Sequence, residues 1–416
     1  MAAPIIRFKK DDGSDYPAWG KYTVSDAFSK IRNKNKDCLN DNVITNSAEF
    51  GLVKQRDFFD KDIANEGNTA NYTIIQQGDF VYNPRKSSFA PMGPFNRYNL
   101  PDDGIVSPLY ICLKPKDVLD ADFLLWYFQT NKWYRYISDN GAQNGARHDR
   151  VGMNDAIMMG IPIAAPCREE QQKIADFLSD VDELINASEE EITNLETQKK
   201  AAMKKIFSQE VRFKKPDGSE FPKWEEKPLG EMCYLRGRIG FRGYTREDLV
   251  EKGNGAISLS PTNIVDGYVN YENNTYISFL KYEESPEIKV SANDILFTKT
   301  GSTVGKIGFV DKMIEPTTIN PQIALITAKD CIPYYLFLAM NTEPCKKYVR
   351  SITVGGAIPT LSQEALKEMK LSVPSLEEQH LIADFLSSFD EAISAAKEEL
   401  KKYRELKKGL LQQMFI

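Results

Sequence analysis

The chain has 416 residues, enough for two or three domains, and its 42% hydrophobic and 11% aromatic content is ordinary for a folded protein. The net charge of −6 would argue against a nucleic-acid partner, but stretch 169–208 carries −5 and stretch 377–416 carries −2, which leaves the remainder at +1. No apolar run has the length of a membrane span and the start has no secretory signal, so we expect a cytoplasmic location. The six cysteines show no metal-ligand spacing, which predicts reduced thiols and no zinc site.

Three short blocks occur twice in the chain, in the same order and at nearly the same offset. Two stretches between them, 31–140 and 240–350, show little similarity that can be aligned. The sequence therefore predicts a repeated framework that carries two divergent bodies. The repeated blocks are RFKKDDGSDYPAW (7–19) and RFKKPDGSEFPKW (212–224), EEQQKIADFLSDVDELI (169–185) and EEQHLIADFLSSFDEAI (377–393), and KKAAMKKIF (199–207) and KKGLLQQMF (407–415).

Each body reads as a mixture of strands and helices. In the first body, DDGSDY at 11–16 predicts a turn, and 71–84 and 104–115 have the composition of strands. Strands are expected again at 255–264, 294–301 and 306–312 in the second body. Apolar, aromatic-rich stretches predict one helix in each body, at 120–137 and 333–349. The fold class is therefore α+β.

Stretches 169–208 and 377–416 predict two long helices, because apolar or neutral residues recur in alternating steps of four and three. Each helix would be a rod of roughly 58 Å with a single apolar stripe that it cannot bury alone. We expect the two copies to pair antiparallel as a coiled coil, although packing into separate domains is the simpler alternative. The carboxylates of the repeat are expected on its solvent or partner face. The seam would contain Ile174, Leu178, Val181, Ile185, Ile382, Leu386, Phe389 and Ile393.

No catalytic or cofactor motif is visible. The chain has two histidines, His148 and His380, which makes a histidine-based triad or metal site improbable. GSTVGK at 301–306 is one spacer short of a phosphate-binding loop and is followed by strand-like residues, so it predicts a glycine-rich hairpin. No GxGxxG motif follows a strand. The missing cofactor and acid–base motifs argue against a nuclease or methyltransferase that acts alone.

Basic residues cluster with aromatic and small polar residues in both bodies. Examples are SKIRNKNK (29–36), VYNPRKSS (81–88) and NGARHDR (144–150) in the first body, and YLRGRIGFRGYTR (234–246) and FTKTGSTVGK (297–306) in the second. Such side chains on loops can contact phosphates and base edges. Taken singly, each cluster is more often a solvated surface.

Together the repeated blocks resemble the framework regions of type I restriction–modification specificity subunits. GDFVYNPRKSS with GIVSPLYI, and NDILFTKTGSTVGKIG with GGAIPTLS, are similar to two classes of their target-recognition domains. The resemblance covers nearly the whole chain. It implies two globular target-recognition domains separated by a pair of antiparallel helices, with a pseudo-twofold internal repeat. The implied domains are recognition domain 1 at 1–168, a spacer helix at 169–208, recognition domain 2 at 209–376 and a second spacer helix at 377–416.

The resemblance also implies a function and partners. Each recognition domain would read one half of a split, asymmetric double-stranded DNA target. The helices would dock two modification (methyltransferase) subunits, which would bind S-adenosylmethionine, and the complex would bring in restriction subunits. Alternatives are a type IIB-like specificity subunit and a coiled-coil scaffold with no DNA role. The DNA-contact candidates that the resemblance implies are Asn83, Arg85, Lys86, Arg147, Arg150, Arg238, Arg242, Lys299, Ser302 and Lys306.

Overall fold

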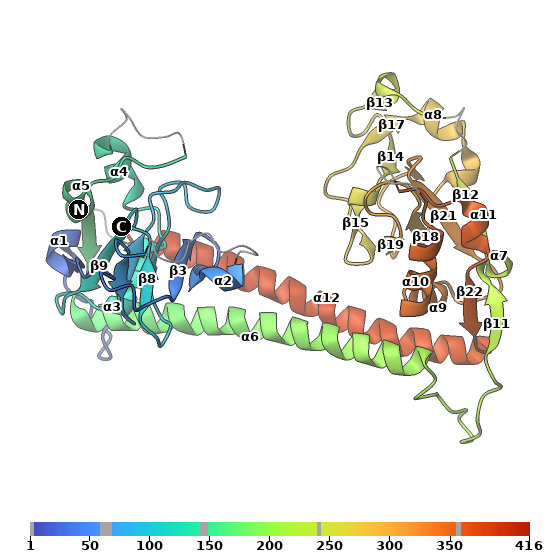
Figure 1. Cartoon of the computed structure of the whole chain (residues 1–416), viewed down its shortest axis with the longest axis horizontal. Coiled ribbons are helices and arrows are strands. Elements are labelled where there is room, and N and C mark those ends of the chain that lie inside the picture. The colour runs from blue at the N-terminus through green and yellow to red at the C-terminus, as the bar shows by residue number, and fades with distance from the viewer. Residues whose placement is uncertain (1–3, 59–68, 142–148, 239–242, 355–358) are drawn as a thin grey trace. The chain divides into compact units, whose positions relative to one another are not determined.

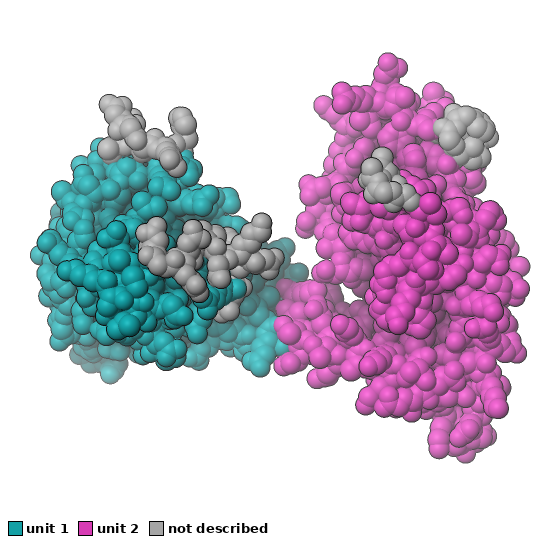
Figure 2. Space-filling view, in the orientation of Figure 1, with its two compact units in different colours: residues 1–190, 398–416 teal, residues 191–397 magenta. Residues whose placement is uncertain are grey.

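The computed structural model describes residues 4–58, 69–141, 149–238, 243–354 and 359–416. These residues form two compact units (Figure 2): unit 1 comprises 1–190 and 398–416, and unit 2 comprises 191–397. The division falls within both long helices, so each unit contains one body together with part of each helix. The element order is mixed, which confirms the predicted α+β class (Figure 1).

Unit 1 contains two four-stranded sheets and one two-stranded ribbon. The first sheet has the order β2-β9-β6-β7 and is antiparallel; the second has the order β4-β3-β8-β5 and contains one parallel pair, β3 with β8. β1 and β10 form the ribbon. The strands are β1 (Gly20–Thr23), β2 (Phe28–Lys30), β3 (Val43–Ser47), β4 (Gly51–Lys54), β5 (Thr73–Ile75), β6 (Phe80–Tyr82), β7 (Phe95–Arg97), β8 (Gly104–Val106), β9 (Ile111–Pro115) and β10 (Pro162–Ala165). The helices are α1 (Val24–Ala27), α2 (Gln55–Phe58), α3 (Ala121–Phe128), α4 (Tyr134–Asn140) and α5 (Asp155–Met159).

Unit 2 has the same plan with a larger sheet. Its sheets have the orders β12-β21-β18-β19-β16-β15 and β13-β17-β14-β20, and β11 with β22 forms the ribbon. The strands are β11 (Glu225–Pro228), β12 (Cys233–Gly237), β13 (Leu249–Val250), β14 (Gly255–Leu259), β15 (Ile264–Val265), β16 (Tyr268–Val269), β17 (Tyr276–Ser278), β18 (Ile295–Thr298), β19 (Ile307–Phe309), β20 (Thr317–Ile319), β21 (Ile323–Ala328) and β22 (Lys370–Val373). The α-helices are α7 (Leu229–Met232), α8 (Phe279–Glu283), α9 (Pro333–Met340), α10 (Glu343–Ile352) and α11 (Gln363–Lys367), and short 3-10 helices lie at Arg246–Asp248, Pro261–Asn263 and Pro286–Ile288.

Both helices predicted within the bodies are interrupted. The first divides into α3 and α4, and the hydroxyl of Thr130 donates to the Tyr127 carbonyl at 2.7 Å where α3 ends. The second divides into α9 and α10 at Asn341 and Thr342. Pro344 lies in the first turn of α10, where a proline is tolerated because its missing N–H would have no intrahelical partner.

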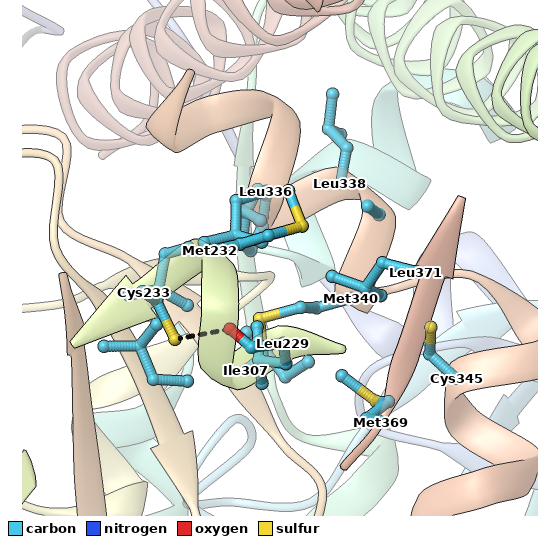
Figure 3. Packing of buried hydrophobic residues seen from close by; sticks show 14 of the residues in the cluster. Leu229, Met232, Cys233, Ile307, Leu336, Leu338, Met340, Cys345, Met369 and Leu371 are labelled. Atoms are coloured by element: carbon cyan, nitrogen blue, oxygen red, sulfur yellow. Dashed lines mark hydrogen bonds between the residues drawn. The ribbon is translucent and has the colours of Figure 1, made fainter. Parts of the chain in front are cut away.

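The core of unit 2 lies between its large sheet and the helices that cover it. Figure 3 shows side chains from α7, α9 and β22 packed together, among them Met232, Leu336 and Leu371. The thiol of Cys233 donates to the Leu229 carbonyl at 3.2 Å, and burial raises the pKa of this thiol to about 12. Cys233 therefore behaves as a packed core residue, as the predicted reduced thiols require.

The two long helices are α6 (Arg168–Phe207) and α12 (Leu376–Gln413), and they pack antiparallel. Ion pairs join Asp182 to Lys407, Glu189 to Arg404, Glu196 to Lys397 and Lys199 to Asp390, so the residue number rises along one helix as it falls along the other. Seven of the eight predicted seam residues are buried, and Phe389 is half-buried. The antiparallel coiled-coil pair is therefore confirmed.

The repeated EEQ at the start of each long helix corrects one expectation. Glu170 and Glu378 do not lie on a solvent or partner face, because both side chains are fully buried within their own units. Arg7 donates to both carboxylate oxygens of Glu170, at 3.0 and 2.7 Å, and to the Pro17 carbonyl at 2.8 Å. Arg212 makes the same contacts to Glu378, at 3.1 and 2.7 Å. We call each set of contacts an Arg–Glu clamp.

The following glutamine connects the helix to the body. Gln171 accepts from the Asp120 N–H at 2.7 Å and donates to the Pro166 carbonyl at 2.8 Å. Gln379 accepts from the Ile332 N–H at 3.0 Å and donates to the Pro374 carbonyl at 3.0 Å. The repeated phrase therefore encodes a buried polar joint between helix and body.

Replacing Arg212 with alanine should destabilise unit 2, because the buried Glu378 carboxylate would lose its counter-charge. We expect a loss of about 3 kcal/mol in the free energy of unfolding. Urea unfolding of the full chain, followed by circular dichroism, measures it. Lys214→Ala, a change at an exposed lysine of the same block, is the control. Equal stability of both variants would contradict a structural role for the clamp.

Candidate nucleic-acid interface

In unit 1, the loop between β6 and β7 (residues 83–94) lies beside the segment 149–151. The Lys86 N–H donates to the Asp149 carbonyl at 2.9 Å and the Val151 N–H donates to the Pro84 carbonyl at 2.8 Å, so the two segments pair as a short antiparallel bridge. At the base of the loop, the Asn83 N–H donates to the Pro94 carbonyl at 3.0 Å. We call these residues loop site 1.

The predicted cations of loop site 1 come together in this bridge. Arg85 and Arg150 are directly opposite one another, and Lys86 follows on the same segment. Arg85 and Lys86 are exposed and Arg150 is half-buried, and no ion pair is found for any of them in the described part of the chain. Like charges directly opposite on paired strands are destabilising. Such an arrangement suits an anion as partner, because a phosphate would compensate both guanidinium groups.

Asn83 holds the loop instead of projecting from it. Its side-chain N–H donates to the Asn46 carbonyl at 3.1 Å, and its side-chain oxygen accepts from the Arg85 N–H at 3.0 Å. Asn46 is buried and donates to the Val81 carbonyl at 2.7 Å, and Asn96 donates to the side-chain oxygen of Asn46 at 2.7 Å. This asparagine network was not predicted from sequence, because its members are far apart in the chain.

Unit 2 has the corresponding arrangement, which we call loop site 2. The loop between β18 and β19 (residues 299–306) lies beside the segment 359–361. The Gly301 N–H donates to the Pro359 carbonyl at 2.9 Å, and the Leu361 N–H donates to the Lys299 carbonyl at 2.8 Å. In each loop site, a loop between two neighbouring strands of one sheet (β6 and β7, or β18 and β19) thus pairs with the segment that precedes a short helix, α5 or α11.

The predicted residues of loop site 2 have different environments. Ser302 is exposed, and Lys306 donates to the Pro261 carbonyl at 3.2 Å. Lys299 is half-buried, and burial lowers the pKa of its ammonium below the ordinary value. The GSTVGK segment forms the turn between two antiparallel strands, as the predicted hairpin requires.

Arg238 belongs to the interior of unit 2. It is 5% exposed, and it donates to the Ile319 carbonyl and to the Thr318 hydroxyl, both at 3.1 Å. Its guanidinium also lies over the Tyr244 ring at 5.4 Å, and burial lowers its pKa. These contacts favour a structural role over the predicted DNA contact. Two further candidates, Arg147 and Arg242, lie outside the described residues.

Within the described ranges, no group of three or more histidine, cysteine or carboxylate side chains is placed to hold a metal ion. None of the helices that the structure describes is both long and apolar enough to cross a membrane.

Comparison with known families places both halves of the chain in one group. The sequence model of the type I restriction modification DNA specificity domain matches residues 17–197 and again 222–403. The chain belongs to this family. The two matches coincide with the two copies of the framework, so this specificity-domain chain carries the family's unit twice.

Individual relatives and solved structures agree with the family. The specificity subunit of the type I restriction enzyme MjaVIII from Methanocaldococcus jannaschii is 26% identical over 74% of this chain and 72% of its own length. The putative MjaX specificity subunit of the same organism is 26% identical over 70% of this chain and 65% of its own length. The crystal structure of a type I restriction–modification S subunit from M. genitalium shares the fold with a TM-score of 0.55, at 16% identity, and the match covers 100% of this chain and 99% of that one.

Replacing Arg85 or Arg150 with alanine should weaken DNA binding and make it less sensitive to salt. If each guanidinium contacts one phosphate, each variant lowers the slope of log affinity against log salt by about 0.9. Fluorescence anisotropy of the chain assembled with its modification subunits, between about 50 and 200 mM salt, measures the slope. Lys21→Ala, at an exposed lysine on β1, is the control. A slope unchanged by both arginine variants would exclude phosphate contacts at loop site 1.

Proposed function

We propose that this chain is the sequence-specificity subunit of a type I restriction–modification complex, and that loop sites 1 and 2 each read one half of a split DNA target. The observation that carries the proposal is the equivalence of the two sites. Both lie in matches to the family's DNA specificity domain, and both are built from a sheet loop paired with the segment before a short helix. Their loops differ in sequence, which suits the recognition of two different half-sites.

The helix pair has the properties of a spacer between the half-sites. α6 has 40 residues and α12 has 38, and neither contains a proline. Half-sites that are read from one face of the duplex are separated by about one helical turn, ~34 Å from centre to centre. At a rise of about 1.5 Å per residue, helices of this length are long enough for that separation.

The chemistry of modification would belong to partner subunits. We infer that two methyltransferase subunits dock on the helices and bind S-adenosylmethionine, that restriction subunits join through them, and that the complex acts on double-stranded DNA in the cytoplasm. The chain itself would position DNA without catalysing a reaction. Net charge supports the division of roles, because a chain at −6 obtains little non-specific affinity for phosphate from its own field.

Mapping methylated adenines in cells with and without this gene tests the proposal. We expect one bipartite, asymmetric motif to lose methylation when the gene is deleted and to regain it on complementation. A methylome that does not depend on the gene would refute the DNA role and favour a coiled-coil scaffold. Neighbouring genes would separate a type I from a type IIB-like context.

Shortening both helices by one heptad should shorten the spacer of the target without changing its half-sites. Deleting 190–196 from α6 together with 397–403 from α12 keeps the Glu189–Arg404 and Lys199–Asp390 pairs in register. Seven residues correspond to about 10 Å of helix, and therefore to about three base pairs. Methylome sequencing reads the result. An unchanged spacer would show that the helices do not set the distance between half-sites.

A further inference from the structure

Two long polar side chains of unit 2 converge on the backbone of Gly237, the last residue of β12. β12 and β18 flank β21 in the large sheet, so Gly237 lies close to the point where Lys299 leaves β18. Gln363 is the first residue of α11, and the Lys299 carbonyl accepts from the Leu361 N–H just before it. Three separate segments of the chain thus bring Gly237, Lys299 and Gln363 together.

Gly237 leaves space that the two side chains occupy. A Cβ atom at this position would come within 2.2 Å of the Gln363 Nε2 and 3.6 Å of the Lys299 Nζ. The head groups therefore lie side by side over a bare stretch of backbone. Any residue other than glycine would displace the amide of Gln363.

Neither head group has a partner among the residues that the structure describes. No hydrogen bond or ion pair of the Lys299 Nζ or of the Gln363 amide occurs in the described chain, although both residues are half-buried. Other polar side chains in the same region are engaged: Lys306 donates to the Pro261 carbonyl, and Gln322 accepts from the Asn320 side chain at 3.1 Å. Both head groups are only partly buried, so they can exchange water for a ligand, and desolvation costs an ammonium more than an amide.

We propose that Lys299 and Gln363 form a base-reading pair, in which Lys299 donates to the O6 and N7 acceptors of a guanine in the half-site read by unit 2. The inference rests on the proposed function and deepens it. Lysine matches the acceptor edge of guanine in the major groove, because an ammonium has donors only. Gln363 both donates and accepts, so it can contact the neighbouring base or hold the ammonium in place.

The position of Lys299 distinguishes base reading from simple phosphate binding. A phosphate contact needs only an exposed cation, such as Arg85 in loop site 1. Lys299 is instead partly buried, which lowers the pKa of its ammonium and removes water that would otherwise solvate it. A guanine edge would restore the lost hydrogen bonds, and a base without these acceptors would leave them unmade. This difference is what produces discrimination.

The experiment uses Lys299→Ala, Gln363→Ala and Gly237→Ala in the chain assembled with its modification subunits. The bipartite motif is first defined from the methylome. Affinity is then measured for oligonucleotides that carry each single base-pair change in that motif. We expect Lys299→Ala to reduce the preference for guanine by about 10- to 100-fold at one position of one half-site. Gly237→Ala should relax the same position or its neighbour, since its Cβ moves Gln363.

Two controls separate the possible outcomes. Lys252→Ala, at an exposed lysine between β13 and β14 of the four-stranded sheet, should change no preference. The half-site read by unit 1 is an internal control in every variant. A uniform loss of affinity for all oligonucleotides after Lys299→Ala would mark a phosphate contact and overturn the inference, as would unchanged discrimination. Failure of the wild-type complex to bind its motif would instead refute the proposed function itself.

Discussion

The Arg–Glu clamp at the start of each long helix is the interaction on which the remaining structure depends. The glutamate carboxylate lies where the repeated RFKK block (7–19 or 212–224), the helix and the body meet. The arginine of that block binds it through two hydrogen bonds. A buried carboxylate is tolerated only when it is paired and hydrogen-bonded. The joint is therefore specific in geometry, and it fixes the direction in which each body leaves its helix. The body can vary elsewhere while this joint is retained.

The two copies of the joint differ in ways that compensate one another. In the first copy, Lys173 donates to Asp11 at 2.6 Å and lies over the Tyr16 ring, whose hydroxyl donates to Glu169 at 2.9 Å. The second copy replaces this polar set with the apolar residues Leu381, Pro216 and Phe221. The exchange of all three together explains why the second copy is more apolar at its start. Replacing Lys173 alone would have left Asp11 without its partner.

The sequence was sufficient for the periodic and repeated features of this chain. The step pattern predicted seam residues that are buried or half-buried in the structure. Arg85, Lys86 and Arg150, which the family resemblance named as DNA-contact candidates, lie together in loop site 1. The sequence did not predict which polar residues are buried in the interior. The burial of Glu170 and Arg238 depends on partners that are distant along the chain, Arg7 and Ile319, and no local pattern marks them. The same holds for Gln363, which becomes part of a site only because α11 begins beside the end of β12.

Charges along the helix pair favour pairing of α6 with α12 over pairing of either helix with a second copy of itself. Asp182–Lys407 and Lys199–Asp390 occupy equivalent positions of the repeat and carry the same charges, so they do not discriminate. Glu189–Arg404 and Glu196–Lys397 are also equivalent, but the charges are exchanged between the helices.

In a pair of two α6 helices with the same register, Glu189 would face Glu196. In a pair of two α12 helices, Lys397 would face Arg404. Each exposed ion pair contributes only about 0.2–1 kcal/mol. Self-pairing, however, would replace an attraction by a repulsion at both the Glu189 and the Glu196 positions, which increases the difference in free energy between the two arrangements. An apolar seam that is nearly the same in both copies could not choose between these arrangements. The exchanged charges therefore direct α6 to α12, which keeps two different bodies in one assembly and suits the reading of an asymmetric target.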